Sequence, residues 1–457
     1  MATVWKPSCL GQNYNDAQNA SALFTSFFIV LGTRFTCWVH DPALPVILRA
    51  QGVSLTHIGG FGLLMAPWAI KVLWAPWVDK FGSSGFGHYR SWIIPTQILT
   101  ISILILLSFI PIESLNHPTY LLAFFITLLL MNTVGATQDI ATDGLAVSIL
   151  KGEQQHIGNM FQVIGSRLGF IVGGGAILWA LDWLNWQSTF LILAAIVLLN
   201  TLPILFYREP QYNRKSILTH DVNSVHLEEE GNNSNRSQNN TTYSIQPSIF
   251  KNIKTYLSYF LSTKVMLAWF AVLCCIKITD GLSGPIIKPL LVDLGLSLSQ
   301  IGIYITMLGA FAALLGAGIA SLCLHVMSRE KAFILFSVLK LVSLAGFAWL
   351  ATLHTRKAQI KPWMIYLINA LEDMFSSMLL VIILTLVMQY SRKEHAGTDF
   401  TFQVSLMAMV AGALYTLSGV AGDWLGYQHY LMTITLIGIL MLIPIFYWSK
   451  LVKAESH

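Results

Sequence analysis

The chain has 457 residues, of which 55% are hydrophobic and only 11% are charged. A soluble globular domain carries about 25% charged residues, so this composition excludes a soluble protein and indicates an integral membrane protein. We expect the lipid bilayer as its surroundings and no nucleic-acid partner.

The N-terminal segment and the cysteines exclude further classes. The first twenty residues are polar, without an apolar core or a small-residue cleavage site, so they predict no removable signal peptide. The five cysteines form no CxxC pair and lie mostly in apolar segments. This pattern favours packing over a disulfide framework or a zinc site, and we expect neither a metal site nor a cofactor.

Twelve apolar segments of roughly twenty residues follow, the length that a helix needs to cross the hydrocarbon. They begin near Ser21, Ile58, Trp92, Thr119, Asn159 and Thr189, and then near Leu261, Gln300, Lys331, Trp363, Phe400 and Tyr430. Residues 208–258, between the two sets, are polar and rich in Asn and Ser, and predict a flexible linker. The predicted fold is an all-α membrane protein of two six-helix bundles, residues 1–207 and 259–457.

The placement of lysine and arginine predicts the orientation. Positive residues favour cytoplasmic loops, and most of those in the connecting segments fall on one side if both termini and the linker are cytoplasmic. Arg356, Lys357 and Lys361 lie on the outer side against this rule. We therefore predict a multi-pass protein with both termini in the cytoplasm.

The two halves resemble each other in sequence. PALPVILRAQGVSLTHIG, from Pro42, aligns without gaps on PIIKPLLVDLGLSLSQIG, from Pro285, at an offset of 243 residues. Further on, the tripeptide Phe-Gln-Val at 161–163 recurs at 402–404, at an offset of 241. Internal repeats are typical of secondary transporters, and an even number of helices per half makes this repeat parallel.

Two cations fall at matching positions of the halves. Arg34 in the first segment aligns with Lys277 in the seventh, and both segments are interrupted by Gly or Pro shortly afterwards. Broken helices at corresponding positions indicate a binding site. We predict that Arg34 and Lys277, with Arg167 and Gln162 in the fifth segment, bind an anionic substrate. The alternative is that Lys277 simply pairs with Asp280, three residues on.

Acidic residues lie inside apolar segments, where charge is costly and marks function by default. Asn132, Asp139 and Asp143 share one stripe of the fourth segment. The candidates for proton coupling are Asp139, Asp143, Glu372, Asp373 and Asp280. The alternative is local neutralisation, with Asp139 or Asp143 pairing with Arg167. Lys71, among tryptophans, is interpreted as reaching to the cytoplasmic interface.

The loop between the second and third segments, together with the two halves and the long linker, resembles the major facilitator superfamily. That family's signature, G-x-x-x-D-[RK]-x-G-[RK]-[RK], is kept at Asp79, Lys80, Gly82 and Arg90. The chain departs from it with Ala75 at the first glycine and with an insertion before Arg90.

Other motifs resemble one branch of this superfamily. KVLWAPWVDK and ATQDIATDGLAV are similar to the branch of bacterial muropeptide permeases and acetyl-CoA transporters. ALPVILRAQGVSLTHIG, PWAIKVLWAPWVDKFG and HYRSWI look closer still to inner-membrane importers of ferric siderophores such as rhizobactin and pyochelin. The likeness covers the N-terminal half well and the C-terminal half mainly through the internal repeat.

The resemblance implies alternating access, in which two bundles rock about a midplane site. It implies gating roles for Asp79 and Arg90 in the loop that closes the inside face, and for Gln138 in the branch motif with Asp139 and Asp143. It also implies a bacterial inner membrane. The leading hypothesis is proton-coupled import of an anionic ferric siderophore, a small-molecule substrate.

Three alternatives differ from this hypothesis. The first is a permease for muropeptides or other small metabolites, for which Trp68, Trp74 and Trp77 would stack on sugars unless they serve as packing or interface anchors. A membrane-embedded enzyme is disfavoured because the chain has no HExxH, GxSxG or paired metal-ligand spacing. A sensor that binds its ligand without moving it is not excluded.

Overall fold

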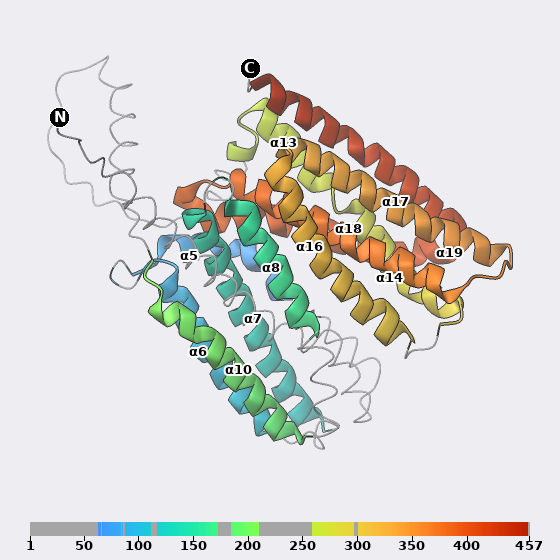
Figure 1. Ribbon diagram of the computed structural model, residues 1–457. Helices are drawn as coiled ribbons and strands as arrows, with labels where there is room; N and C mark the ends of the chain where they lie inside the picture. The colour runs from blue at the N-terminus through green and yellow to red at the C-terminus, as the bar shows by residue number, and fades with distance from the viewer. Residues whose placement is uncertain are drawn as a thin grey trace, which may run out of the picture.

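The computed structural model describes residues 63–64, 66–83, 85, 87–110, 117–150, 152, 154–171, 184–209, 258–296 and 300–455. Regular structure in these ranges is helical, apart from one isolated bridge between Ser83 and Gly87. The helices form an N-terminal group, blue to green in Figure 1, and a C-terminal group, yellow to red.

The N-terminal group contains one broken helix and four long ones. Its elements are α4 (Ala66–Ile70), η3 (Lys71–Leu73), α5 (Ala75–Lys80), α6 (Arg90–Ser108), α7 (Pro118–Ile149), α8 (Gln154–Phe170) and α10 (Trp186–Phe206). α10 begins where the Asn185 side chain accepts a hydrogen bond from the backbone N–H of Ser188, a capping contact that satisfies one of the free donors of the first turn.

The C-terminal group is built from longer helices. Its elements are α13 (Lys264–Cys275), α14 (Ile278–Asp293), η6 (Ile301–Met307), α16 (Leu308–Val326), α17 (Arg329–Thr355), α18 (Pro362–Gln389), η7 (Lys393–His395) and α19 (Ala396–Glu455). The 60 residues of α19 are two helices in sequence, because Gly426 has a φ of 70° and interrupts the helical backbone between them.

Eight helical segments of the described ranges are long and apolar enough to cross a membrane. They match the predicted segments near Trp92, Thr119, Thr189, Leu261, Gln300, Lys331, Trp363 and Tyr430. The segment near Asn159 corresponds to α8, the one near Phe400 to the first part of α19, and the one near Ile58 ends in α4, η3 and α5. The segment near Ser21 lies outside the described residues.

Each group has its own apolar packing. In the N-terminal group α6, α7 and α10 bury a cluster that includes Leu104, Phe124 and Val197. In the C-terminal group α16 packs closely on α18, because Gly316 has no side chain: a Cβ there would lie 2.3 Å from the Met374 carbonyl oxygen. Small residues allow membrane helices to approach in this way.

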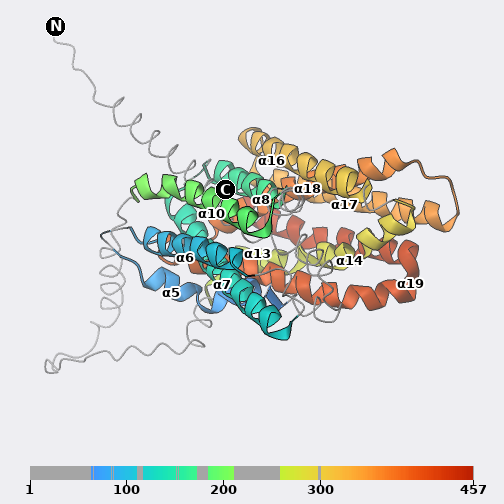
Figure 2. The ribbon, with the colours of Figure 1, turned by 90° about the horizontal axis from the view of Figure 1, so that it is seen from below.

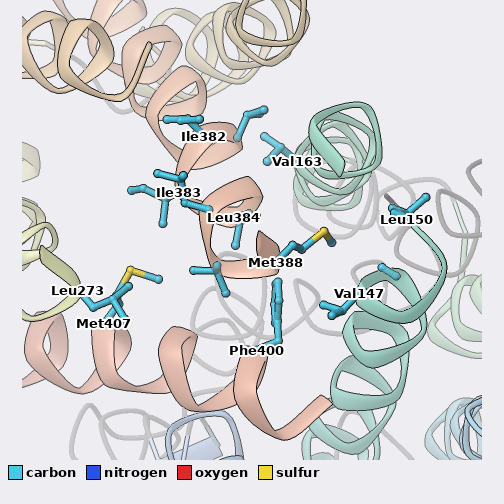
Figure 3. Packing of buried hydrophobic residues seen from close by; sticks show 14 of the residues in the cluster. Val147, Leu150, Val163, Leu273, Ile382, Ile383, Leu384, Met388, Phe400 and Met407 are labelled. Carbon is cyan, nitrogen blue, oxygen red and sulfur yellow. The ribbon is translucent and has the colours of Figure 1, made fainter. Parts of the chain in front are cut away.

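The two groups meet at one end, here called the joined end: α5, α7, α16 and α18 end there, and α8, α17 and α19 begin there. Figures 1 and 2 show α8 beside α16, and Figure 1 shows the start of α19 beside α5. Val147 and Val163 of the N-terminal group share one buried cluster with Met388 and Phe400 of the C-terminal group (Figure 3). The joined end therefore has a continuous apolar core.

Candidate functional site

Charged side chains lie deep inside both groups of helices. A helix rises about 1.5 Å per residue. Asp139 lies ten residues before the end of α7, and Lys340 lies eleven residues after the start of α17. These positions are about 15 and 17 Å from the joined end, near the middle of a hydrocarbon layer about 30 Å thick. Such charges require partners within the protein.

In the N-terminal group the deep charges form an ion pair. The Lys71 Nζ lies 2.5 Å from the Asp139 Oδ2, and the Lys71 side chain is only 3% exposed. Lys71 therefore does not reach to the interface, and the interpretation of it as a snorkelling residue is wrong. Burial is possible because the chain between α4 and α5 tightens into η3, which holds Lys71 against α7. Asp139 is thus paired with Lys71.

Two tryptophans flank this ion pair. The Trp68 Nε1 donates to the Asn132 Oδ1 at 3.0 Å, and the Trp74 Nε1 donates to the Thr137 Oγ1 at 3.1 Å. These hydrogen bonds fasten the broken helix to α7, which agrees with the packing interpretation of both residues. The Trp77 side chain is instead 52% exposed.

Asp143 lies one turn closer to the joined end and contacts α8. Its Oδ1 accepts a hydrogen bond from the Gln162 Nε2 at 2.8 Å. Gln162 is the glutamine of the repeated Phe-Gln-Val tripeptide. Its counterpart in the other half, Gln403, accepts a hydrogen bond from the Trp269 Nε1 at 2.7 Å. Gln138, also predicted, is buried in α7. The structure thus brings Asp143 and Gln162 together.

In the C-terminal group four charges form one network. The Lys277 Nζ lies 2.6 Å from the Asp280 Oδ2, and the Lys340 Nζ lies 3.3 Å from the Asp280 Oδ1. Lys340 also contacts the Glu372 carboxylate and donates to the Ser376 hydroxyl. The two lysines balance the two acids, so the network is neutral as a whole. The pairing of Lys277 with Asp280 is the alternative that the sequence left open.

Sequence reasoning missed Lys340. The residue stands in KAFILFSVLKLVSLAGF, where it is the one charge in an otherwise apolar run after Lys331. That isolation is itself a signal, because a lone charge within a membrane span is functional by default. The internal repeat does not indicate this position, because the third segment has no equivalent charge.

Asp373 joins the two groups electrostatically. The Asn369 Nδ2 donates to the Asp373 Oδ2 at 3.0 Å, and a Cβ at Gly309 would lie 2.2 Å from the same oxygen. Arg167 of α8 exerts a Coulombic attraction on this carboxylate. The charges of Arg167 in α8 and Asp373 in α18 therefore interact across the boundary between the groups. Arg34, the other predicted cation, lies outside the described residues.

Asp79 connects the groups at the joined end. Its Oδ2 accepts from the Thr398 backbone N–H at 2.7 Å and from the Thr398 hydroxyl at 2.6 Å, and its Oδ1 accepts from the Gly397 N–H at 3.1 Å. A Cβ at Gly397 would lie 2.7 Å from this Oδ1, so the approach requires glycine. A carboxylate at the N-terminus of α19 is stabilised by free N–H groups and by the helix dipole.

Tyr89 extends this contact to the end of α10. Its hydroxyl donates to the Asp79 Oδ1 at 2.8 Å, while its backbone N–H donates to the Glu209 Oε2 at 3.1 Å. Burial raises the pKa of Glu209, and hydrogen bonds from the backbone of Arg90 and Tyr89 oppose this rise. The Arg90 guanidinium donates to the Leu205 carbonyl at 3.1 Å, within the N-terminal group.

Arg329, which sequence reasoning also missed, makes a second contact between the groups at the joined end. Its guanidinium donates to the Gly152 carbonyl at 2.6 Å and to the Gln155 Oε1 at 3.0 Å. Deeper in the same boundary the Asn159 Nδ2 donates to the Thr385 Oγ1 at 3.3 Å. Arg329 and Asn159 belong to no sequence motif, so only the fold shows these contacts.

The donor types in the described ranges suit binding and proton exchange. No group of three His, Cys, Asp or Glu residues among them is arranged to hold a metal ion. These residues include buried and half-buried carboxylates that lie close to a lysine or an amide.

Comparison with known proteins identifies the family of the chain. A family model described as Major Facilitator Superfamily matches residues 24–415. The anhydromuropeptide permease of Escherichia coli strain K12 is 30% identical over 164 residues, which are 36% of this chain and 32% of the permease, so the match spans about a third of that relative. A Rickettsia conorii protein named as transporter AmpG 4 is 21% identical over 436 residues, covering 94% of this chain and 97% of that protein.

A solved structure shows the same fold. The proton:xylose symporter XylE, bound to 6-bromo-6-deoxy-D-glucose, superimposes with a TM-score of 0.68 at 12% identity, over 96% of each chain. The membrane-spanning helices, the buried ion pairs between them and the family match all indicate a membrane transporter. The chain belongs to the Major Facilitator Superfamily and is a multi-pass membrane transporter, not an enzyme.

Proposed function

We propose that the chain is a proton-coupled permease that carries a muropeptide-like solute by alternating access. The substrate class is supported by the Escherichia coli anhydromuropeptide permease, and transport as such also by the Rickettsia conorii protein, which is named as a transporter and matches over almost its whole length. We place the protein in a bacterial inner membrane, with the joined end facing the cytoplasm. The two moving bundles are residues 1–207 and 259–457, connected by residues 208–258.

The observation that carries the proposal is the network of Lys340, Asp280, Lys277 and Glu372. Leaving a buried ion without its partner costs several kcal/mol, so protonation of one carboxylate in this network changes which partners Lys340 holds. Such a redistribution gives the bundle two discrete arrangements. A transporter needs this kind of coupling between a proton and a conformation.

The charge balance of the described site favours this substrate class over a ferric siderophore. A site for a strongly anionic chelate needs uncompensated positive charge, whereas Lys277 and Lys71 each lie close to a carboxylate. A muropeptide, a sugar joined to a short peptide, offers hydroxyl and amide groups for side chains such as Gln162 and Asn369. One relative reported above, the Escherichia coli permease, is named for an anhydromuropeptide, and none of those reported is named for a siderophore.

The roles of the predicted residues follow from their positions. Asp79 holds the joined end closed in this proposal, and Arg90 and Gln138 support it from within the N-terminal group. Glu372 and Asp280 exchange the coupling proton. The remaining acids, Asp139, Asp143 and Asp373, stabilise the two halves through Lys71, Gln162 and Arg167.

A binding experiment tests the substrate class. The purified protein is heated with a purified anhydromuropeptide or with ferric rhizobactin, and the unfolding temperature is followed. We expect the muropeptide to raise the unfolding temperature, because a ligand that binds only the folded state stabilises it. A rise with the siderophore alone would reverse the assignment.

A variant tests the coupling. We expect Glu372→Gln to bind the muropeptide but to lose accumulation against a gradient, while exchange of labelled for unlabelled solute continues. The matched control is Glu455→Gln, which removes an exposed carboxylate at the end of α19. Full accumulation by the Glu372 variant would show that this carboxylate does not carry the proton.

A further inference from the structure

Gln97 lies deep inside the N-terminal group without a hydrogen bond to its side chain. The residue stands about two turns into α6 and is 0% exposed. Neither its amide nitrogen nor its amide oxygen has a hydrogen-bond partner among the residues that the structure describes. A buried amide normally has a partner, which is either another protein group or an ordered water molecule. The partner of Gln97 therefore has to be found.

Gln97 lies between two separate apolar clusters. Ile93, one turn before it, belongs to the cluster that both groups share at the joined end. Leu104, two turns after it, belongs to the cluster of the N-terminal group alone. Residues four and seven positions apart share one face of a helix. The amide of Gln97 therefore points into the packed interior of the N-terminal group, at the level where one cluster ends and the other begins.

The two helices that pack against α6 also carry a carboxamide at the transition between the clusters. These residues are Gln138 on α7 and Asn200 on α10, which are 1% and 7% exposed. Each lies three or four positions from an apolar residue of either cluster and shares a helix face with both. The flanking residues are Val134 and Ala141 on α7, and Val197 and Ile204 on α10.

A close contact between α6 and α7 shows that Gln97 and Gln138 lie at a similar depth. A Cβ at Gly144 would lie 2.5 Å from a ring carbon of Tyr89, so these two residues touch. From this contact, Gln97 lies about 12 Å further along α6 and Gln138 about 9 Å further along α7, at 1.5 Å per residue. The two amides thus differ in depth by less than one helical turn.

A hydrogen bond between α6 and α10 gives the same result for Asn200. The Arg90 guanidinium donates to the Leu205 carbonyl at 3.1 Å. From this bond, Gln97 lies about 10 Å further along α6 and Asn200 about 8 Å further along α10. The three amides therefore form one polar layer between the apolar clusters of the N-terminal group.

We propose that Gln97, Gln138 and Asn200, here called the amide layer, enclose a site for ordered water inside the N-terminal group. A carboxamide has two N–H donors and an acceptor oxygen, and a buried water makes about three hydrogen bonds to polar groups. Water bridges amides that are too far apart to bond directly, so Gln138 and Asn200 each need to supply only one hydrogen bond. Three neutral amides favour water over an ion, because they offer no charge to balance that of an ion.

The amide layer separates two parts of the core. The cluster on its joined-end side contains residues of both groups, such as Ile93 and Phe400, whereas the cluster on its other side contains residues of the N-terminal group alone. The water site therefore lies within one group of helices. Its occupancy does not depend on the solute class proposed above.

A density map of the purified protein at a resolution that shows ordered water tests the site directly. We expect density for water at hydrogen-bonding distance, up to about 3.2 Å, from both the Oε1 and the Nε2 of Gln97. A map in which this amide bonds only to protein groups, or has no water beside it, would overturn the proposal.

The sign of a stability change gives a second test. Gln97→Leu and Gln97→Met replace the amide by apolar groups of similar size. If the amide holds water, both variants should lower the unfolding temperature by about 2 °C or more, because the water loses a partner and the other two amides lose part of their hydration. If the amide is dry, both changes would remove a buried polar group without a partner and raise the unfolding temperature.

The matched control is Leu104→Met, on the same face of α6 but inside an apolar cluster. A swap between apolar side chains of similar volume should change the unfolding temperature less than either Gln97 variant does. A rise or no change in either Gln97 variant would overturn the proposal. If neither variant folds, the density map alone decides.

Discussion

Asp79→Asn should open the joined end. The carboxylate accepts four hydrogen bonds, three of them from Gly397 and Thr398 of the other group. An amide keeps one acceptor oxygen and turns an NH₂ group towards one backbone N–H and one hydroxyl. The hydroxyl can turn to accept from this group, but the bond from the backbone N–H of Gly397 or Thr398 is lost. Hydrogen bonds to charged groups contribute about 1.5–3 kcal/mol each. The contact between the groups should weaken by at least about 1.5–3 kcal/mol, a shift of about tenfold or more in the populations of closed and open forms.

The assay is the distance between spin labels at positions 83 and 331, measured at pH 7.5. The matched control is Asp293→Asn, which removes a carboxylate that accepts from the Tyr427 hydroxyl within the C-terminal group and not between groups. We expect longer distances in the Asp79 variant and unchanged distances in the control. If the Asp79 variant keeps the distance distribution of the unsubstituted protein, the carboxylate at the N-terminus of α19 does not hold the joined end.

Further variants test the charges at Asp139, Lys340 and Glu209. Asp139→Asn should destabilise the protein by about 3–5 kcal/mol, because it leaves the Lys71 ammonium buried without a counter-charge. The double variant Lys71→Met, Asp139→Leu should regain most of this stability in thermal unfolding, and no gain would contradict the pairing. Lys340→Met should lower the unfolding temperature more than Lys450→Met, an exposed lysine of α19, and equal effects would count against the network. Burial raises the pKa of Glu209, so the contribution of its protonated form to stability is present at low pH and is lost as the pH rises above the ordinary pKa of 4.5. The unfolding temperature of Glu209→Gln should therefore fall less between pH 4 and 7 than that of the unsubstituted protein. An equal fall would show that another group is responsible.

Much of the architecture was predictable because the bilayer imposes a simple rule on sequence. A helix must present about twenty apolar residues to cross the hydrocarbon, and eight of the predicted segments coincide with spans of the described ranges. Charges in those segments were equally conspicuous: Asp139, Asp143, Glu372 and Asp280 are each buried or half-buried among the helices.

The partners of these charges were much harder to predict. Lys71 is 68 positions from Asp139, and Lys340 is 60 positions from Asp280, so no local spacing links them. The pair of Lys277 and Asp280 could be foreseen because it lies within one helical turn. The contacts of the joined end depend on how two bundles meet, which the sequence of either bundle does not encode by periodicity.

The measurement that tests the account most directly is proton movement in proteoliposomes containing the purified protein. A labelled anhydromuropeptide is added outside, with and without an inward pH gradient, and both solute uptake and internal acidification are followed. We expect that solute accumulates only with the gradient, that protons enter with it, and that Glu372→Gln removes the accumulation. Uptake to the same level without a gradient, or without proton entry, would contradict it.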